Sequence, residues 1–287
     1  MTRFWNRLAL IALGLVLAAS AALEPAMAGI GEPSMWQMNM QPPVTEVARD
    51  INDLHDILIW VITAISVFVL ALLIYVMVKF NEKANPVPSK LTHNTMLEIA
   101  WILIPCLILV YIAIPSFKLL RLQIELPKPD ITVKAIGHQW YWSYEYGQDQ
   151  NGGFAFDSYM LTREDAVKAN QPALLAVDNE LVLPAGKTIV VQVLGADVIH
   201  NFAVSSFGIR MDAVPGRMNQ TWFKTDKEGV YYGQCSRLCG QNHAFMPIAV
   251  RIVSPEKYAA WLVEAKKKFA SSEDGLKQVA ALPSSAQ

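Results

Sequence analysis

Two long uncharged segments dominate the hydrophobic pattern of this 287-residue chain, at residues 57–78 and 99–117. Each segment is apolar all round, without the polar stripe of a surface helix. A helix of about 20 apolar residues crosses a hydrocarbon core roughly 30 Å thick. The pattern therefore predicts two transmembrane helices, and Pro105 and Pro115 predict a kink in the second.

The charges around these segments predict their orientation. Residues 79–98 hold three lysines, whereas residues 29–56 hold one arginine and several acids, so the loop is expected in the cytoplasm. Residues 1–28 combine Arg3 and Arg7, an apolar run and a small-residue end, which predicts a secretory signal peptide. An uncleaved anchor is the alternative. We expect residues 29–56, and everything after the second helix, on the outer side.

From residue 130 the pattern changes to short β-branched and aromatic runs separated by turn residues, which is typical of a β-sandwich or small barrel. Residues 147–178 show no clear element, residues 254–270 have helical composition, and residues 271–287 resemble a flexible tail. Strands are expected at 131–136, 140–146, 181–183, 188–194, 202–204, 221–224, 230–233 and 248–252.

Composition narrows the class of protein. The chain is 53% hydrophobic and 17% charged, with a formal net charge of −1, which is too apolar for an ordinary soluble protein. Nucleic-acid binding needs a concentrated basic surface, and the sequence has none.

The densest candidate chemistry lies near the C-terminal end, where Cys235, Cys239, His243 and Met246 fall within twelve positions. His200 is a candidate remote ligand. In an oxidising compartment the two cysteines could instead form a disulfide, or the cluster could hold structural zinc. Met246 favours copper, because a thioether is a poor zinc ligand and a common copper ligand.

Three further motifs carry a resemblance to a known family: HQWYWSYEY at 138–146, DAVPGR at 212–217 and YYGQCS at 231–236. Together with the predicted signal peptide, helical hairpin and outer β domain, they resemble subunit II of bacterial cytochrome c oxidases. The resemblance covers roughly residues 30–265. It implies a two-helix transmembrane hairpin followed by an all-β, cupredoxin-like sandwich at 130–253, in the periplasm of a bacterial inner-membrane protein.

The resemblance also implies a dinuclear copper centre, CuA, with two bridging thiolates. Its ligands would be His200, Cys235, the backbone carbonyl of Arg237, Cys239, His243 and Met246. Most relatives have glutamate where this chain has Arg237, and that carboxylate helps to hold magnesium at the interface with subunit I. Here the magnesium site is expected to be absent, built from other groups, or replaced by an arginine ion pair.

Roles for other residues follow from the same resemblance. Trp140 would pass electrons from cytochrome c, and Glu98 would stand at a proton-channel entrance, unless it is only a residue at the membrane boundary. An acidic patch would steer cytochrome c. Its candidate residues are Glu145, Asp157, Asp178, Glu180 and Asp197.

The implied function is that of the electron-entry subunit of a proton-translocating oxidase. Electrons would pass from cytochrome c through CuA to haem in subunit I, which reduces oxygen to water, with subunit III as a further partner. A membrane-anchored copper-binding or copper-delivery module is the alternative. Subunit II of a quinol oxidase has a similar architecture but lacks the copper ligands present here.

Overall fold

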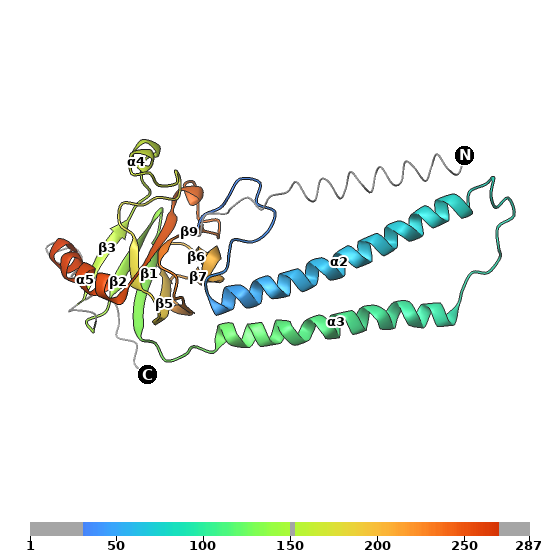
Figure 1. Cartoon of the computed structure of the whole chain (residues 1–287), viewed down its shortest axis with the longest axis horizontal. Coiled ribbons are helices and arrows are strands. Elements are labelled where there is room, and N and C mark those ends of the chain that lie inside the picture. Colours follow the sequence, from blue (N-terminus) through green and yellow to red (C-terminus); the bar gives the residue numbers. More distant parts are fainter. Residues whose placement is uncertain (1–30, 150–152, 270–287) are drawn as a thin grey trace.

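The computed structural model describes residues 31–149 and 153–269, which form a helical hairpin attached to a β-sandwich (Figure 1). The expected signal peptide at 1–28 and tail at 271–287 lie outside the described residues.

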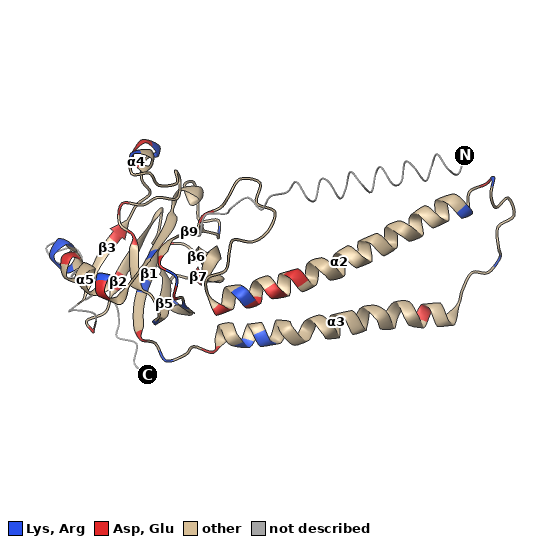
Figure 2. Cartoon of the chain, viewed as in Figure 1, with Lys and Arg blue, Asp and Glu red and all other residues tan. Residues whose placement is uncertain are grey.

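The hairpin consists of α2 (Glu46–Lys79) and α3 (Thr95–Ile124), which run side by side away from the sandwich (Figure 1). Both helices are long and apolar enough to cross a membrane. Both extend past the uncharged segments toward the sandwich, where their charged residues gather (Figure 2). Asn94 caps α3, which continues as one helix through Pro105 and Pro115. The hydrophobic runs therefore mark the lipid-facing parts of longer helices.

The outer domain has two five-stranded sheets, ordered β3-β2-β1-β5-β8 and β4-β10-β9-β6-β7. Most neighbours are antiparallel, but β1 pairs with β5 and β10 with β4 in parallel, so both sheets are mixed. The strands are β1 (Ile131–His138), β2 (Tyr141–Tyr146), β3 (Phe154–Ser158), β4 (Leu181–Pro184), β5 (Thr188–Gly195), β6 (His200–Val204), β7 (Ile209–Ala213), β8 (Asn219–Lys224), β9 (Gly229–Cys235) and β10 (Pro247–Val253).

The core lies between the sheets and is rich in aromatic side chains. Trp142, Tyr144 and Tyr146 alternate along β2 and point inward, as the period of a strand requires. Helix α5 (Pro255–Phe269) closes one end of the core, where Trp261 packs against Tyr146.

Some elements are absent from the sequence prediction. Residues 147–178, where the pattern predicts nothing clear, contain β3 and the short helix α4 (Arg163–Lys168). Strand β7 is also unpredicted; its burial is irregular, so it lacks a clean alternation of apolar and polar positions. The expected strand at 140–146 begins one residue later, because Gln139 and Trp140 form a two-residue turn between the paired residues His138 and Tyr141.

A buried threonine joins the hairpin to the sandwich. The Thr45 hydroxyl accepts from the Ala48 N–H at 3.0 Å, capping α2, and donates to the Phe207 carbonyl at 2.7 Å. Phe207 belongs to the turn η1 (Ser205–Phe207), and the Val44 N–H donates to Ser206 beside it. One side chain therefore sets both the start of the helix and its attachment to the domain.

We predict that Thr45→Ala destabilises this junction by about 1–2 kcal/mol, because it removes a helix cap and leaves a buried carbonyl without its donor. The measurement is thermal unfolding of the full chain in detergent. Thr92→Ala removes an exposed hydroxyl ahead of α3 and is the matched control. Equal unfolding temperatures for the two variants would contradict the role given to Thr45.

Candidate metal centre

Three chain segments meet at one end of the second sheet. Strand β6 begins with His200, β9 ends with Cys235, and the connection 236–246 leads into β10. Because β6 and β10 both run antiparallel to β9, the start of each lies beside the end of β9. The topology thus brings His200 next to a cysteine 35 positions later in the sequence.

The donor atoms surround a common volume centred on Cys239. Its sulfur lies 3.8 Å from the Cys235 sulfur, 3.6 Å from the Met246 sulfur and 3.5 Å from Nδ1 of His243. The ligand atoms of His200, Cys235 and Cys239 all lie within 4.8 Å of one another. Donors on one tetrahedral metal, with bonds of about 2.3 Å, stand about 3.7 Å apart. The spacing therefore suits metal ligands.

His200 is fully buried, and its ring is fixed from two sides. Nε2 lies 2.8 Å from an Asp197 carboxylate oxygen, while Nδ1 is buried without a hydrogen-bond partner among the described residues. A Cβ added to Gly137 would lie 2.9 Å from three atoms of the His200 side chain. An imidazole held through one nitrogen, with the other free, has the usual arrangement of a metal ligand.

The cysteine loop is held against the β1–β2 turn. Gln139 Nε2 and Trp140 Nε1 both donate to the Cys239 carbonyl, at 3.0 and 3.3 Å. Gly240 has a φ of +126° and lies so close to Trp140 that an added Cβ would be 2.9 Å from the indole. The Arg237 carbonyl lies 3.2 Å from the Cys235 sulfur. The Arg237 carbonyl, which the family resemblance implies as a copper ligand, is thus in contact with the Cys235 thiol.

The two thiols differ in acidity. Burial would raise the pKa of Cys235, but the adjacent His200 imidazole and hydrogen bonds with backbone groups lower it to about 6. Burial and the charge of Cys235 raise the pKa of Cys239 to about 12. Two thiolates this close repel each other, so loss of the second proton is disfavoured in the metal-free pair. A cation between the sulfurs would favour the second deprotonation.

The donor set favours copper over the alternatives left open by the sequence. Both cysteines are free thiols, and their sulfur separation far exceeds the roughly 2.05 Å of a disulfide. Met246 is 1% exposed and directs its thioether at Cys239, which a zinc site would not require.

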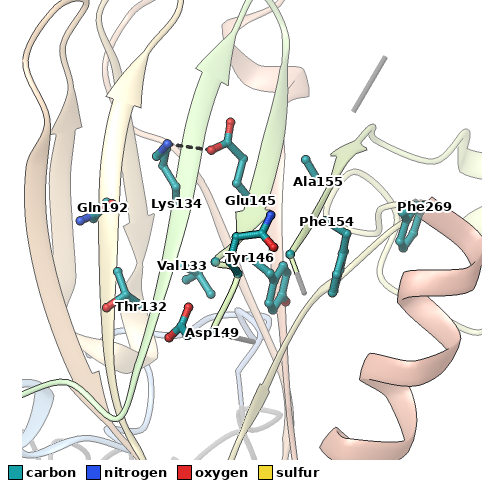
Figure 3. A pocket seen from close by; sticks show the side chains of 13 residues that line it. Thr132, Val133, Lys134, Glu145, Tyr146, Asp149, Phe154, Ala155, Gln192 and Phe269 are labelled. Carbon is teal, nitrogen blue, oxygen red and sulfur yellow. Dashed lines mark hydrogen bonds and ion pairs between the residues drawn. The ribbon is translucent and has the colours of Figure 1, made fainter. Parts of the chain in front are cut away.

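The acidic residues expected in a docking patch have unequal environments. Glu145 is buried, and it pairs with Lys134 at 2.7 Å beside a cavity of about 290 Å³ (Figure 3). Glu180 pairs with Arg251, and Asp157 accepts from Ser143 at 2.6 Å. Asp178 and Asp197 are exposed. A run of acids in the sequence does not reveal which of them are neutralised by partners.

Glu98 lies elsewhere, in the first turn of α3, at the end of the hairpin far from the sandwich (Figure 2). The structure does not bring it near the cysteine loop.

Sequence reasoning missed the residues that support the ligands. Gly137, Gln139 and Asn201 carry no metal-binding signal in the sequence, yet Gly137 contacts His200, and Asn201 accepts from Ser236 at 2.7 Å. From the sequence, Asp197 is expected only in the docking patch. Its position three residues before a candidate histidine ligand was the one available signal for its second role.

We predict that Gly137→Ala lowers copper affinity about 10- to 100-fold, the range for loss of a group that orients a ligand. The added methyl would displace the His200 ring, and competition with a copper chelator measures the effect. Gly216→Ala is the control for a loss of stability alone, because residue 216 has a φ of +73° that strains any side chain, while its Cβ would meet nothing within 4 Å. Unchanged affinity in Gly137→Ala would argue against His200 as a ligand.

Comparisons with known proteins cover both the hairpin and the sandwich. The family described as cytochrome c oxidase subunit II, periplasmic domain, matches residues 131–253, and its transmembrane domain matches residues 33–119. A probable cytochrome c oxidase subunit 2 of Rickettsia bellii is 46% identical over 262 residues, covering 91% of this chain and 94% of the relative. The subunit 2 of Cereibacter sphaeroides is 43% identical, covering 89% of each chain.

Among solved structures, the periplasmic domain of cytochrome oxidase subunit II of Bradyrhizobium japonicum is 56% identical, with a TM-score of 0.47. The match covers 50% of this chain and 99% of that one. In this chain, as in the family, the transmembrane domain precedes the periplasmic domain. This chain is therefore a membrane protein that belongs to the cytochrome c oxidase subunit II family.

Proposed function

We propose that this chain accepts electrons from cytochrome c at a dinuclear copper centre, CuA, and passes them to haem in subunit I. That subunit reduces oxygen to water, and the reaction is coupled to proton translocation. The observation that carries the proposal is the packing of two free thiols, a thioether, an imidazole and a backbone carbonyl around one volume, with the His200 ring beside them. The residues of the cluster fit the ligand set of the family.

Bound copper would supply a one-electron redox couple at this site. The protein's contribution is rigidity: Cys235, Cys239 and Met246 are almost completely buried, and the strands on either side are paired. Asp197 holds the His200 ring in one orientation. Exclusion of water and a fixed ligand geometry limit the rearrangement that accompanies a change of charge.

Trp140 is the proposed point of electron entry. The two-residue turn places its indole at the tip of the β1–β2 hairpin, partly exposed, with Nε1 donating to the carbonyl of Cys239. The side chain therefore links the surface to a proposed copper ligand through one hydrogen bond.

For cytochrome c docking, the exposed Asp178 and Asp197 support a steering role better than Glu145 and Glu180. The latter two carboxylates are paired with basic side chains, so they contribute less to the long-range field.

For the interfacial cation, the structure favours the third alternative. An Arg237 guanidinium nitrogen lies 3.7 Å from an Asp212 carboxylate oxygen, so the arginine supplies the positive charge beside this acid. We propose that this arginine takes the place of magnesium at the interface with subunit I.

The membrane arrangement completes the proposal. The sandwich would lie in the periplasm of a bacterium, with the hairpin in the inner membrane against subunit I and residues 1–28 as a signal peptide. Glu98 would then stand on the cytoplasmic side as the entrance of a proton channel.

The metal content separates this function from copper delivery. We predict two copper ions per chain and a mixed-valence EPR signal in which both coppers share one unpaired electron. Cys239→Ser should abolish the signal, because its sulfur contacts the other donors. Met218→Leu, a change of an exposed thioether that is not among the proposed ligands, is the control. A single copper with an ordinary mononuclear spectrum would favour the delivery module instead.

Replacement of Trp140 should slow electron entry without removing copper. For Trp140→Leu we predict a loss of at least about tenfold in the rate of CuA reduction by cytochrome c, or about 1.4 kcal/mol in activation free energy. Stopped-flow absorption measures this rate. Tyr141→Leu removes the adjacent ring, which stacks on His138 and Tyr159, and should have a smaller effect. Equal rates for the two variants would remove the special role of Trp140.

A further inference from the structure

A methionine-rich segment lies outside the proposed centre, ahead of α2. Met35, Met38 and Met40 are 3 of the chain's 11 methionines and fall within six residues. Their side chains are 81%, 91% and 43% exposed, and Trp36 between them is 91% exposed. Methionine is among the residues most often buried in proteins. Three exposed thioethers so close together therefore call for a ligand or a partner.

The segment is fixed at both ends. The Gly31 carbonyl accepts from the Tyr232 N–H of β9 at 2.8 Å, and an added Cβ at Gly31 would lie 2.3 Å from the Val230 carbonyl. At the other end, Gln41 accepts from the Ser206 hydroxyl at 2.9 Å. The methionines thus lie on a short connection between two anchored points of the sandwich.

The local backbone folds the start of the segment into a turn. The Gln37 N–H donates to the Ser34 carbonyl, and the Ser34 N–H donates to the Gln37 side chain, which closes a turn with Met35 and Trp36 at its tip. Trp36 has a φ of +61°, an uncommon conformation for a bulky residue. Each methionine has three rotatable bonds beyond the backbone, so the sulfurs can reach a shared ion from these positions.

We propose that Met35, Met38 and Met40 form a second copper site, which binds Cu(I) through three thioethers, with Trp36 available for a cation–π contact. Soft sulfur ligands select Cu(I) over zinc and over hard cations. An exposed indole face can add to the binding of a monovalent cation.

The position suggests a use. Tyr232, the anchor of the segment, is three residues before Cys235 on the same strand, a distance of about 10 Å along β9. Copper bound at the methionines would be held on a segment whose first anchor, at Tyr232, lies on the strand that ends with Cys235. The binding site stands on its own residues, whereas its role in loading the centre rests on the proposed function.

The first experiment is Cu(I) titration of the full chain in detergent, against a chromogenic Cu(I) chelator. A background of Cys235→Ser, Cys239→Ser and Met246→Leu removes the sulfur donors of the proposed centre. We expect this protein to bind about one Cu(I), with an affinity nearly unchanged between pH 7 and pH 5, because thioethers do not take up protons in this range, whereas imidazole ligands do. Adding Met35→Leu, Met38→Leu and Met40→Leu should abolish the binding.

Leucine keeps the size and apolar character of methionine, so these changes separate copper binding from burial against another subunit. Met218→Leu in the same background is the control, and it should leave binding unchanged. The proposal is overturned if the background protein binds no Cu(I) at pH 5, or if the triple leucine change leaves the titration as it was.

The second experiment tests loading. With limiting Cu(I), followed by oxidation, the EPR signal of the centre should develop more slowly in the triple leucine variant than in the unmodified chain, with equal signals at saturating copper. Equal rates at limiting copper would overturn the loading role. Failure of both proteins to form a two-copper signal would overturn the proposed function instead, while the titration would still report on the methionine site.

Discussion

The structure of the metal centre depends on the burial of two sulfurs whose charges oppose each other. Cys235 and Cys239 are each 5% exposed with their sulfurs 3.8 Å apart, so the doubly deprotonated pair is unfavourable without a cation. The surrounding groups are arranged around this constraint. Hydrogen bonds stabilise one thiolate, His200 leaves Nδ1 unpartnered, and Met246 brings a neutral soft donor that adds no charge.

The sandwich provides the rigidity that such a pair needs. The donors come from the start of β6, the end of β9 and the connection into β10, and each of these strands is paired with a neighbour. Cys239 lies in a loop and not in a strand. The loop is held because the Cys239 carbonyl accepts hydrogen bonds from the side chains of Gln139 and Trp140. The turn proposed to admit electrons is therefore also part of the support of the thiol pair.

The sequence predicted what depends on local pattern. The two membrane helices follow from long apolar runs, and eight of the ten strands coincide with β-branched or aromatic runs. Strand β3 carries alternating Phe154 and Phe156, a signal that was missed inside a long polar stretch, whereas β7 has no regular pattern and is a strand through its pairing with β6. The ligand residues were available from their chemistry and from the family resemblance. The role of Gly137 could not be predicted from the sequence, because it arises only where β1 packs against β6 and Gly137 meets His200.

Charge is the property that the sequence predicts least well here. Glu145 and Asp178 are both acids in the same acidic stretch, yet one is buried against Lys134 and the other is exposed to solvent. Ion pairing depends on which strands become neighbours, and β1 and β2 bring Lys134 directly opposite Glu145.

The methionine segment differs from the acidic residues in this respect. Its three thioethers are uncharged and lie within six residues of one another, so the chemistry proposed for them depends little on the rest of the fold. The proposed buried centre needs the sandwich to hold its ligands, whereas the proposed thioether site needs only a short anchored connection, so the two sites would place different demands on the same chain.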